Sequence, residues 1–232
     1  MFALLLGGAA RASQPSPALP SPRDLAQQIY ALDPSPQLVL YLTGGGAQLA
    51  PWVLATAGAS RSVLELRVPY SERALAQLLA KRPARYCAPD VARKMARAAY
   101  LRAGELAAGA ARGPRVGLGC TAALRSERPR RGEHRCYIAV YTERGLHELS
   151  LKLAKDARSR ELEDAVVARC ALLALAASCG ITVEGAREFW RLWPGEGDDA
   201  PKPRAERKAL GLHDISQEEL QWSFREHLNR SV

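Results

Sequence analysis

An apolar segment that ends in three glycines constrains this chain most. Gln37–Leu42 reads QLVLYL, Thr43 and Gly44–Gly46 follow at once, and a helical pattern covers 47–55. A strand that turns through glycines into a helix is typical of layered α/β domains, where such turns direct backbone N–H groups at one point. This geometry suits a phosphate or a carboxylate, although a tight structural connection also needs glycines. The spacing is neither that of a P-loop, because no Gly-Lys-Ser/Thr follows, nor that of GxGxxG.

Strands and helices continue to alternate along the chain. Helical spacing predicts helices over 23–32, 71–81, 88–110 and 159–180. Apolar and alternating runs predict strands over 62–70, 114–122, 135–142 and 146–154, the last two as a hairpin. Ser71 is the expected N-cap of its helix, and Gly180 the expected left-handed residue after the last one. We therefore expect an α/β fold, a three-layer sandwich with a mixed sheet and helices on both faces.

The two ends of the chain differ from its middle. Residues 1–21 contain serines, prolines and no acidic residue, which predicts a disordered leader with a bias towards a transit peptide. Residues 22–184 form the expected α/β domain. Residues 185–232 begin as a linker and end in an amphipathic helical pattern over 215–228, where Ser216 and Glu219 form a capping box. We expect this helical tail to pack on its own domain or on a protein partner.

Lysine and arginine exceed aspartate and glutamate by 33 to 24, a formal net charge of +9. The excess lies in residues 1–184, with 25 basic and 15 acidic residues, whereas the remainder has 8 and 9. This basic character favours an anionic partner such as a phosphorylated metabolite, a nucleic acid or an acidic protein. A gene that favours arginine codons gives the same excess.

The five cysteines include no CxxC pair, which predicts reduced thiols and neither a zinc site nor a disulfide framework. Nothing in the sequence indicates a metal or a cofactor. The longest apolar runs fall far short of the roughly 18 residues of a membrane span, so no membrane association is expected. We expect a cytoplasmic protein, or a mitochondrial or plastid one if the leader is a transit peptide.

The order of several short motifs resembles the CinA C-terminal family, the nicotinamide-nucleotide amidohydrolases. In that family Ser-Cys-Thr-Gly-Gly ends the first strand, and a Gly-Ser-Ser turn leads to a strand that closes in Tyr-Ser-Asn-x-x-Lys. Here Thr43 with its glycines matches the first motif, Gly58–Arg61 the turn, and Tyr70 with Ser71 the last motif. The resemblance extends over roughly 38–178 and implies a homodimer.

The departures from this pattern fall on the positions that carry chemistry. Tyr41 stands at the position of the family's serine nucleophile, and Leu75 at the position of its assisting lysine. A phenol, with a pKa near 10, attacks an amide poorly, and leucine cannot take a proton. The third group, the assisting tyrosine of the family's last motif, is retained as Tyr70. Because the nucleophile and the lysine are absent, no catalytic residue is expected.

The positions that the resemblance implies for ligand binding match the family's pattern better than the catalytic positions do. We expect the glycine turn at the carboxyl end of its strand, with Tyr70 close to it. The arginine-rich segment 125–135 adds guanidinium groups that match phosphate oxygens, although a solvated loop has the same composition. The expected ligand-binding residues are Thr43, Gly44, Gly45, Gly46, Tyr70, Ser71, Arg128 and Arg130.

The sequence therefore predicts a catalytically degenerate CinA C-terminal-like domain that binds a phosphorylated nucleotide, such as a pyridine nucleotide, or acts as an assembly subunit. The alternative is an active nicotinamide-nucleotide amidohydrolase that uses substitutes such as Tyr70 or His134. A histidine beside one carboxylate, as His134 is beside Glu133, is more often structural. Nucleic acid is a less favoured partner, because no aromatic residue lies between Ala122 and Arg135 to stack on bases.

Overall fold

The computed structural model describes residues 20–107, 113–128, 131–183 and 220–226. The helices in these ranges are α1 (Pro22–Tyr30), α2 (Leu49–Leu54), α3 (Ala59–Ser62), α4 (Glu72–Leu78), α5 (Pro89–Leu106) and α6 (Arg160–Ser178). The strands are β1 (Gln37–Thr43), β2 (Val63–Arg67), β3 (Arg115–Ala123), β4 (His134–Thr142), β5 (Gly145–Leu153) and β6 (Leu220–Glu226). None of these helices combines the length and the hydropathy that crossing a membrane requires.

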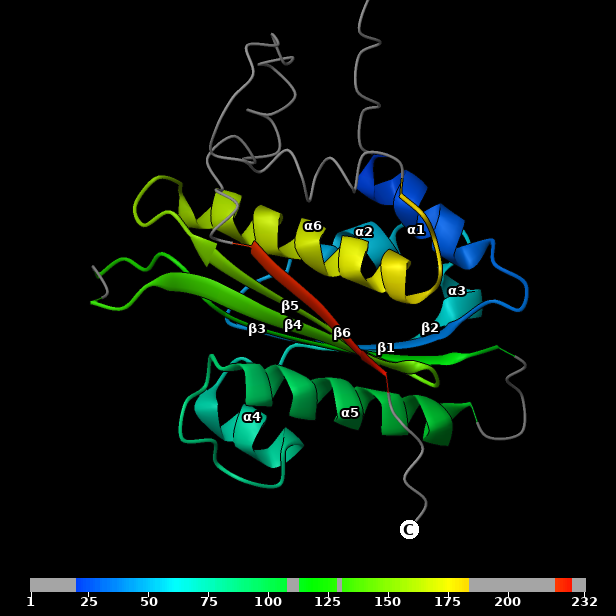
Figure 1. The fold of residues 1–232 in the computed structure, drawn as a ribbon, viewed down its shortest axis with the longest axis horizontal. Helices are drawn as coiled ribbons and strands as arrows, with labels where there is room; N and C mark the ends of the chain where they lie inside the picture. The colour runs from blue at the N-terminus through cyan, green and yellow to red at the C-terminus, as the bar shows by residue number, and fades with distance from the viewer. Residues whose placement is uncertain (1–19, 108–112, 129–130, 184–219, 227–232) are drawn as a thin grey trace, which may run out of the picture.

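The strands form one mixed sheet in the order β2-β1-β3-β4-β5-β6. β1 runs parallel to β2 and β3, and the remaining neighbours pair antiparallel. Helices α1, α2 and α6 cover one face of the sheet, and α4 and α5 cover the other (Figure 1). This arrangement confirms the three-layer α/β sandwich that the sequence predicts.

β1 lies inside the sheet and is buried along its whole length. Leu38, Leu40 and Leu42 belong to the core on the α6 side, whereas Val39 and Tyr41 belong to the core on the α5 side. A strand covered on both faces needs apolar side chains at successive positions, which explains the continuous apolar run. Its carboxyl end, and the glycine turn after it, therefore lie between the carboxyl ends of β2 and β3.

α5 packs directly on β3, and two glycines make this close approach possible. An added Cβ at Gly117 would overlap backbone atoms of Ala96 and Tyr100. One at Gly119 would overlap backbone atoms of Ala92 and Ala96 and would lie 2.7 Å from the Cβ of Met95. The helix can lie this close only because β3 has no side chain at these two positions.

Local signals for the ends of elements are confirmed. The Ser71 hydroxyl accepts a hydrogen bond from the backbone N–H of Ala74 at 3.1 Å, as an N-cap does. Gly180, with φ +84°, adopts the left-handed conformation just after α6. β4 and β5 pair antiparallel as the predicted hairpin.

The C-terminal helix predicted over 215–228 is wrong where the structure describes that segment. Leu220–Glu226 forms β6, which pairs antiparallel with β5 and places Trp222 opposite Leu149. A helix satisfies only its own backbone groups, whereas a strand here also satisfies the N–H and C=O groups along the edge of β5. The predicted capping box, the linker and all but the last two residues of the leader lie outside the described residues.

Candidate ligand-binding site

The glycine turn lies where β1 ends and the chain enters α2. Gly44 and Gly46 have φ of +75° and +83°, in the left-handed region that favours glycine. An added Cβ on Gly44 would overlap the carbonyl oxygen of Ala122, near the end of β3. The turn is therefore held tightly against the neighbouring strand.

An internal carboxylate already occupies the N–H groups that follow this turn. Asp164, on α6, accepts hydrogen bonds from the backbone N–H groups of Gly46 at 2.8 Å, Ala47 at 3.2 Å and Gln48 at 2.9 Å. The turn thus binds an anion, as the sequence suggests, but that anion belongs to the protein. Asp164 is more than 100 residues away in the sequence, and no local pattern marks it as a partner. A ligand phosphate needs other donors.

Replacing Asp164 by asparagine should lower the free energy of unfolding by about 2 kcal/mol, because charge-assisted hydrogen bonds are the stronger kind and the amide NH₂ would face other donors. Urea denaturation measures the effect. Glu161→Gln is the matched control, since this exposed carboxylate lies in the same first turns of α6 and should change the value by under about 1 kcal/mol. Equal stability of Asp164→Asn and the wild type would contradict the anchoring role.

Arg160, the first residue of α6, joins three segments at the turn. Its Nη2 donates to the carbonyl oxygen of Gly44 at 3.1 Å and to the hydroxyl of Tyr70 at 3.2 Å. Its Nη1 donates to the carbonyl oxygen of Arg125 at 2.8 Å. Tyr70 therefore lies beside the glycine turn, as expected from the sequence, and the arginine that holds it there was not expected.

Two hollows share Gly44 and Tyr70 in their linings. The first, named the Thr43 hollow, has a volume of about 380 Å³. Its lining includes Thr43, Gly44, Tyr70, Ser71, Leu75, Arg85, Cys87, Thr121 and Arg135. The second, named the Arg160 hollow, has a volume of about 470 Å³. Its lining includes Gly44, Gly45, Val68, Tyr70, Arg160, Glu161 and Asp164.

Tyr41 and Leu75, the positions where the sequence departs from the CinA pattern, both belong to the core on the α5 side. Tyr41 is only 2% exposed, and its hydroxyl donates to Glu65 at 3.0 Å. Burial, and then the hydrogen bond and charge of Glu65, raise the pKa of Tyr41 to about 12. Leu75 is buried with it but also lines the Thr43 hollow. The Tyr41 phenol is thus a buried core group that lines neither hollow.

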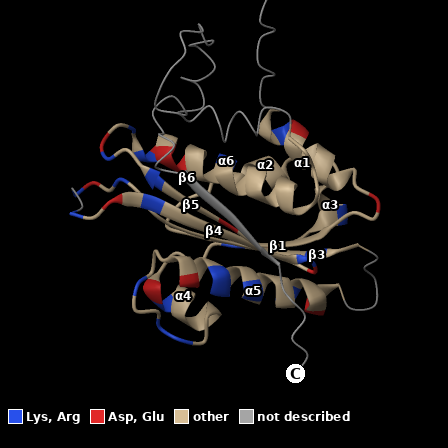
Figure 2. Cartoon of the chain, viewed as in Figure 1, with Lys and Arg blue, Asp and Glu red and all other residues tan. Residues whose placement is uncertain are grey.

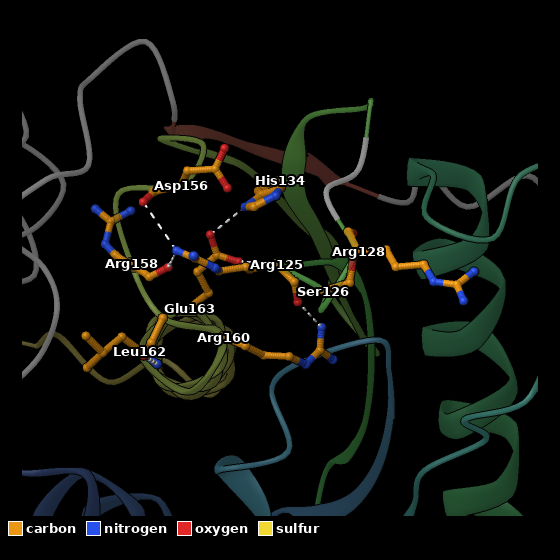
Figure 3. A network of polar contacts seen from close by, with 10 residues as sticks. Arg125, Ser126, Arg128, His134, Asp156, Arg158, Arg160, Leu162 and Glu163 are labelled. Carbon is orange, nitrogen blue, oxygen red and sulfur yellow. Dashed lines mark hydrogen bonds and ion pairs between the residues drawn. The ribbon is translucent and has the colours of Figure 1, made fainter.

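The arginine-rich segment does not act as one cluster. Arg125 donates hydrogen bonds to the carbonyl oxygens of Asp156 and Arg158. Arg128 is exposed and extends away from them towards α5 (Figure 3). Arg130 lies outside the described residues. Of the described arginines of this segment, Arg135 lines the Thr43 hollow. Arg85, from the α4–α5 connection, lines it as well, and the sequence did not indicate this residue. Figure 2 shows lysine and arginine near α4 and the loops at that end of the sheet, while α6 is uncharged over most of its length.

His134 is buried beside a carboxylate of α6. It is 1% exposed, and its Nδ1 lies 2.6 Å from Glu163 Oε1 on the fully buried side chain of Glu163 (Figure 3). The other oxygen of Glu163 accepts from the backbone N–H of Arg125 at 2.6 Å. Glu133, which precedes His134 in the sequence, forms an ion pair with Lys152 at 2.5 Å instead. His134 therefore anchors the arginine-rich segment to α6 rather than facing a hollow.

Cys87 is the thiol in the Thr43 hollow. Its Sγ lies 3.8 Å from the carbonyl oxygen of Thr121 and 3.7 Å from that of Arg135, the positions of weak S–H donors. The thiol is thus a weak donor to two backbone carbonyl oxygens in the wall of this hollow.

The domain belongs to the class of three-layer α/β sandwiches: a mixed sheet has helices on both faces, and a candidate ligand site lies at the carboxyl ends of its parallel strands. Solved proteins of the CinA superfamily share this fold. A competence/damage-inducible protein from Agrobacterium tumefaciens superposes with a TM-score of 0.55 and 17% identity, over 71% of this chain and 99% of that chain. A CinA superfamily protein from Escherichia coli gives 0.52 and 18%, over 66% and 86%. A competence or damage-inducible protein from Enterobacter asburiae gives 0.54 and 15%, over 69% and 98%.

No protein-family model and no curated protein matches the sequence. The fold is CinA-like, as the order of the short motifs indicates, although the identities are low.

Proposed function

We propose that this domain binds a phosphorylated nucleotide in the Thr43 hollow and does not hydrolyse it. The proposal rests on the side chain of Arg135. Its Nε is buried and has no hydrogen-bond partner among the described residues, and its side chain lines the hollow. Buried donors are nearly always satisfied, so this guanidinium favours an acceptor supplied from outside the chain.

The charges around the hollow support an anionic ligand. Arg135 meets Glu133 only at 3.9 Å, and Arg85, which also lines the hollow, is exposed. The carboxylate of this lining, Glu72, already accepts hydrogen bonds from Arg82 at 3.1 Å and from the Tyr86 hydroxyl at 2.9 Å. Two guanidinium groups can bind phosphate oxygens bidentately. A volume of about 380 Å³ lies in the range of small-molecule sites.

The hydroxyl groups fit the remainder of a nucleotide. Thr43 donates its hydroxyl to the carbonyl oxygen of Pro69 at 2.8 Å, and Thr121 donates to that of Tyr86 at 2.8 Å. Both hydroxyl oxygens keep acceptor capacity for ribose or amide N–H and O–H groups. The exposed ring of Tyr70 offers a surface on which a base can stack.

Isothermal titration with nicotinamide mononucleotide should detect binding, and Arg135→Ala should weaken it by on the order of 1.5–3 kcal/mol, about 10- to 150-fold in Kd, because a charge-assisted hydrogen bond is lost. Arg73→Ala is the control, since this exposed arginine lines neither hollow. An unchanged Kd in Arg135→Ala, together with weakening in Arg128→Ala, would move the phosphate to the arginine-rich loop.

The purified protein should release no ammonia from nicotinamide mononucleotide above background. Hydrolysis through an enzyme nucleophile needs that nucleophile and a base, and the two positions hold the buried Tyr41 and the apolar Leu75. The alternative amidohydrolase would have to use Tyr70, because His134 is buried against Glu163. Sustained turnover that is lost in Tyr70→Phe, measured by coupled ammonia detection, would establish that alternative.

A further inference from the structure

We propose that the Thr43 hollow and the Arg160 hollow form one groove for a dinucleotide, a ligand with two nucleosides joined by a pyrophosphate. This inference rests on the proposed nucleotide-binding function and extends it. Gly44 and Tyr70 line both hollows, so the two share a wall at the glycine turn. A ligand that fills both has to pass this wall, and Arg160 lies there.

Arg160 is suited to bind the anionic centre of such a ligand. Its described partners are the carbonyl oxygens of Gly44 and Arg125 and the hydroxyl of Tyr70, all uncharged groups. These contacts use three of the five N–H donors of a guanidinium and leave two. The contacts also fix the side chain, so that little rotamer entropy is lost when a pyrophosphate binds.

The Arg160 hollow is suited to a nucleoside and not to further phosphates. Val68 and Tyr70, 45% and 66% exposed, give it apolar walls on which a base can pack. Glu161 places an exposed carboxylate in the lining. In dinucleotide-binding folds such a carboxylate accepts hydrogen bonds from ribose hydroxyls, and its charge repels phosphate. Asp164 is taken up by the turn. The charges therefore favour a dinucleotide over a polynucleotide: its first phosphate stays on Arg135, as proposed for the mononucleotide, its second phosphate meets Arg160, and its second nucleoside fills the Arg160 hollow.

Titration with three probes separates this inference from the proposed function. The probes are nicotinamide mononucleotide, adenosine monophosphate and nicotinamide adenine dinucleotide. The dinucleotide should bind at least about tenfold more tightly than either mononucleotide, since the second half binds without a second loss of translational freedom.

Two variants locate the second half. Val68→Trp fills the Arg160 hollow without touching the Thr43 hollow, and Arg160→Ala removes the charge at the shared wall. Val68→Trp should abolish the advantage of the dinucleotide and leave nicotinamide mononucleotide within about twofold of its wild-type Kd. Arg160→Ala should also abolish that advantage, but it should weaken both ligands, because Arg160 holds Tyr70 at the Thr43 hollow. Leu54→Trp is the matched control for Val68→Trp, because Leu54 is similarly exposed, at 54% against 45%, and lines neither hollow.

Each outcome decides one of the two ideas. A dinucleotide that binds no more tightly than the mononucleotides overturns the shared groove and leaves the proposed function in place. An advantage that survives in both Val68→Trp and Arg160→Ala also overturns it. If none of the three probes binds, the proposed function itself is wrong, and the groove with it.

Discussion

Gly119→Ala is expected to destabilise the domain by about 3 kcal/mol, at the upper end of the cost of overpacking a core. The added methyl group would meet backbone atoms of Ala92 and Ala96 in α5, together with the Cβ of Met95 at 2.7 Å. Backbone atoms cannot rotate away, so the helix would have to move off the sheet. Gly119 does not have a positive φ, so the effect is purely steric. Urea denaturation followed by circular dichroism measures it.

Gly132→Ala is the matched control for this substitution. Its added Cβ would have no heavy atom within 4 Å, and the residue is exposed in the loop before β4. We expect its free energy of unfolding to stay within about 0.5 kcal/mol of the wild type. If Gly119→Ala were as stable as Gly132→Ala, α5 would not lie directly on β3 as described.

The features that the sequence predicted well are those encoded by neighbouring residues. The apolar run of β1 and the glycines after it placed the turn, Ser71 marked the start of α4, and Gly180 marked the end of α6. These signals act within a few residues, where backbone conformation and helix capping are decided. The layered fold follows from their order along the chain.

The features that the sequence did not reveal depend on contacts between distant segments. Asp164 satisfies the turn from α6, and Arg160 joins the turn to Tyr70. Neither residue differs in type from the other charged residues at the start of that helix. Arg85 likewise lines the Thr43 hollow because of where the α4–α5 connection runs. One sequence, without related sequences, carries no record of such pairings.

The wrong prediction of a helix in the C-terminal segment also arises from a contact between distant segments. Leu220 and Phe224 are spaced as on one face of a helix, but Leu220, Trp222 and Phe224 also alternate as in a strand. The choice between the two is made by β5, whose edge is available for pairing, and not by residues 220–226 themselves. Local propensity is weak enough for such an edge to override it.

Tyr41→Ser, which introduces the serine of the CinA pattern that the sequence resembles, is expected to destabilise the domain by roughly 3–5 kcal/mol, as removal of a large buried ring does. The ring is 2% exposed and packs in the core with Leu75 and Met95. Its loss leaves a cavity and also removes the hydroxyl that donates to Glu65. Tyr41→Phe keeps the ring and should lose only about 1 kcal/mol for that hydrogen bond.

Tyr41→Ser should also remain inactive towards nicotinamide mononucleotide, because Leu75 still provides no base for the new hydroxyl. Adding Leu75→Lys would place an amine at a position that is 2% exposed, where a charge without a partner is costly. A serine at position 41 and a lysine at position 75 therefore conflict with the apolar packing on this side of the sheet. Ammonia release by Tyr41→Ser alone, at unchanged stability, would show that the pocket still accepts the serine and would overturn the degenerate-site proposal.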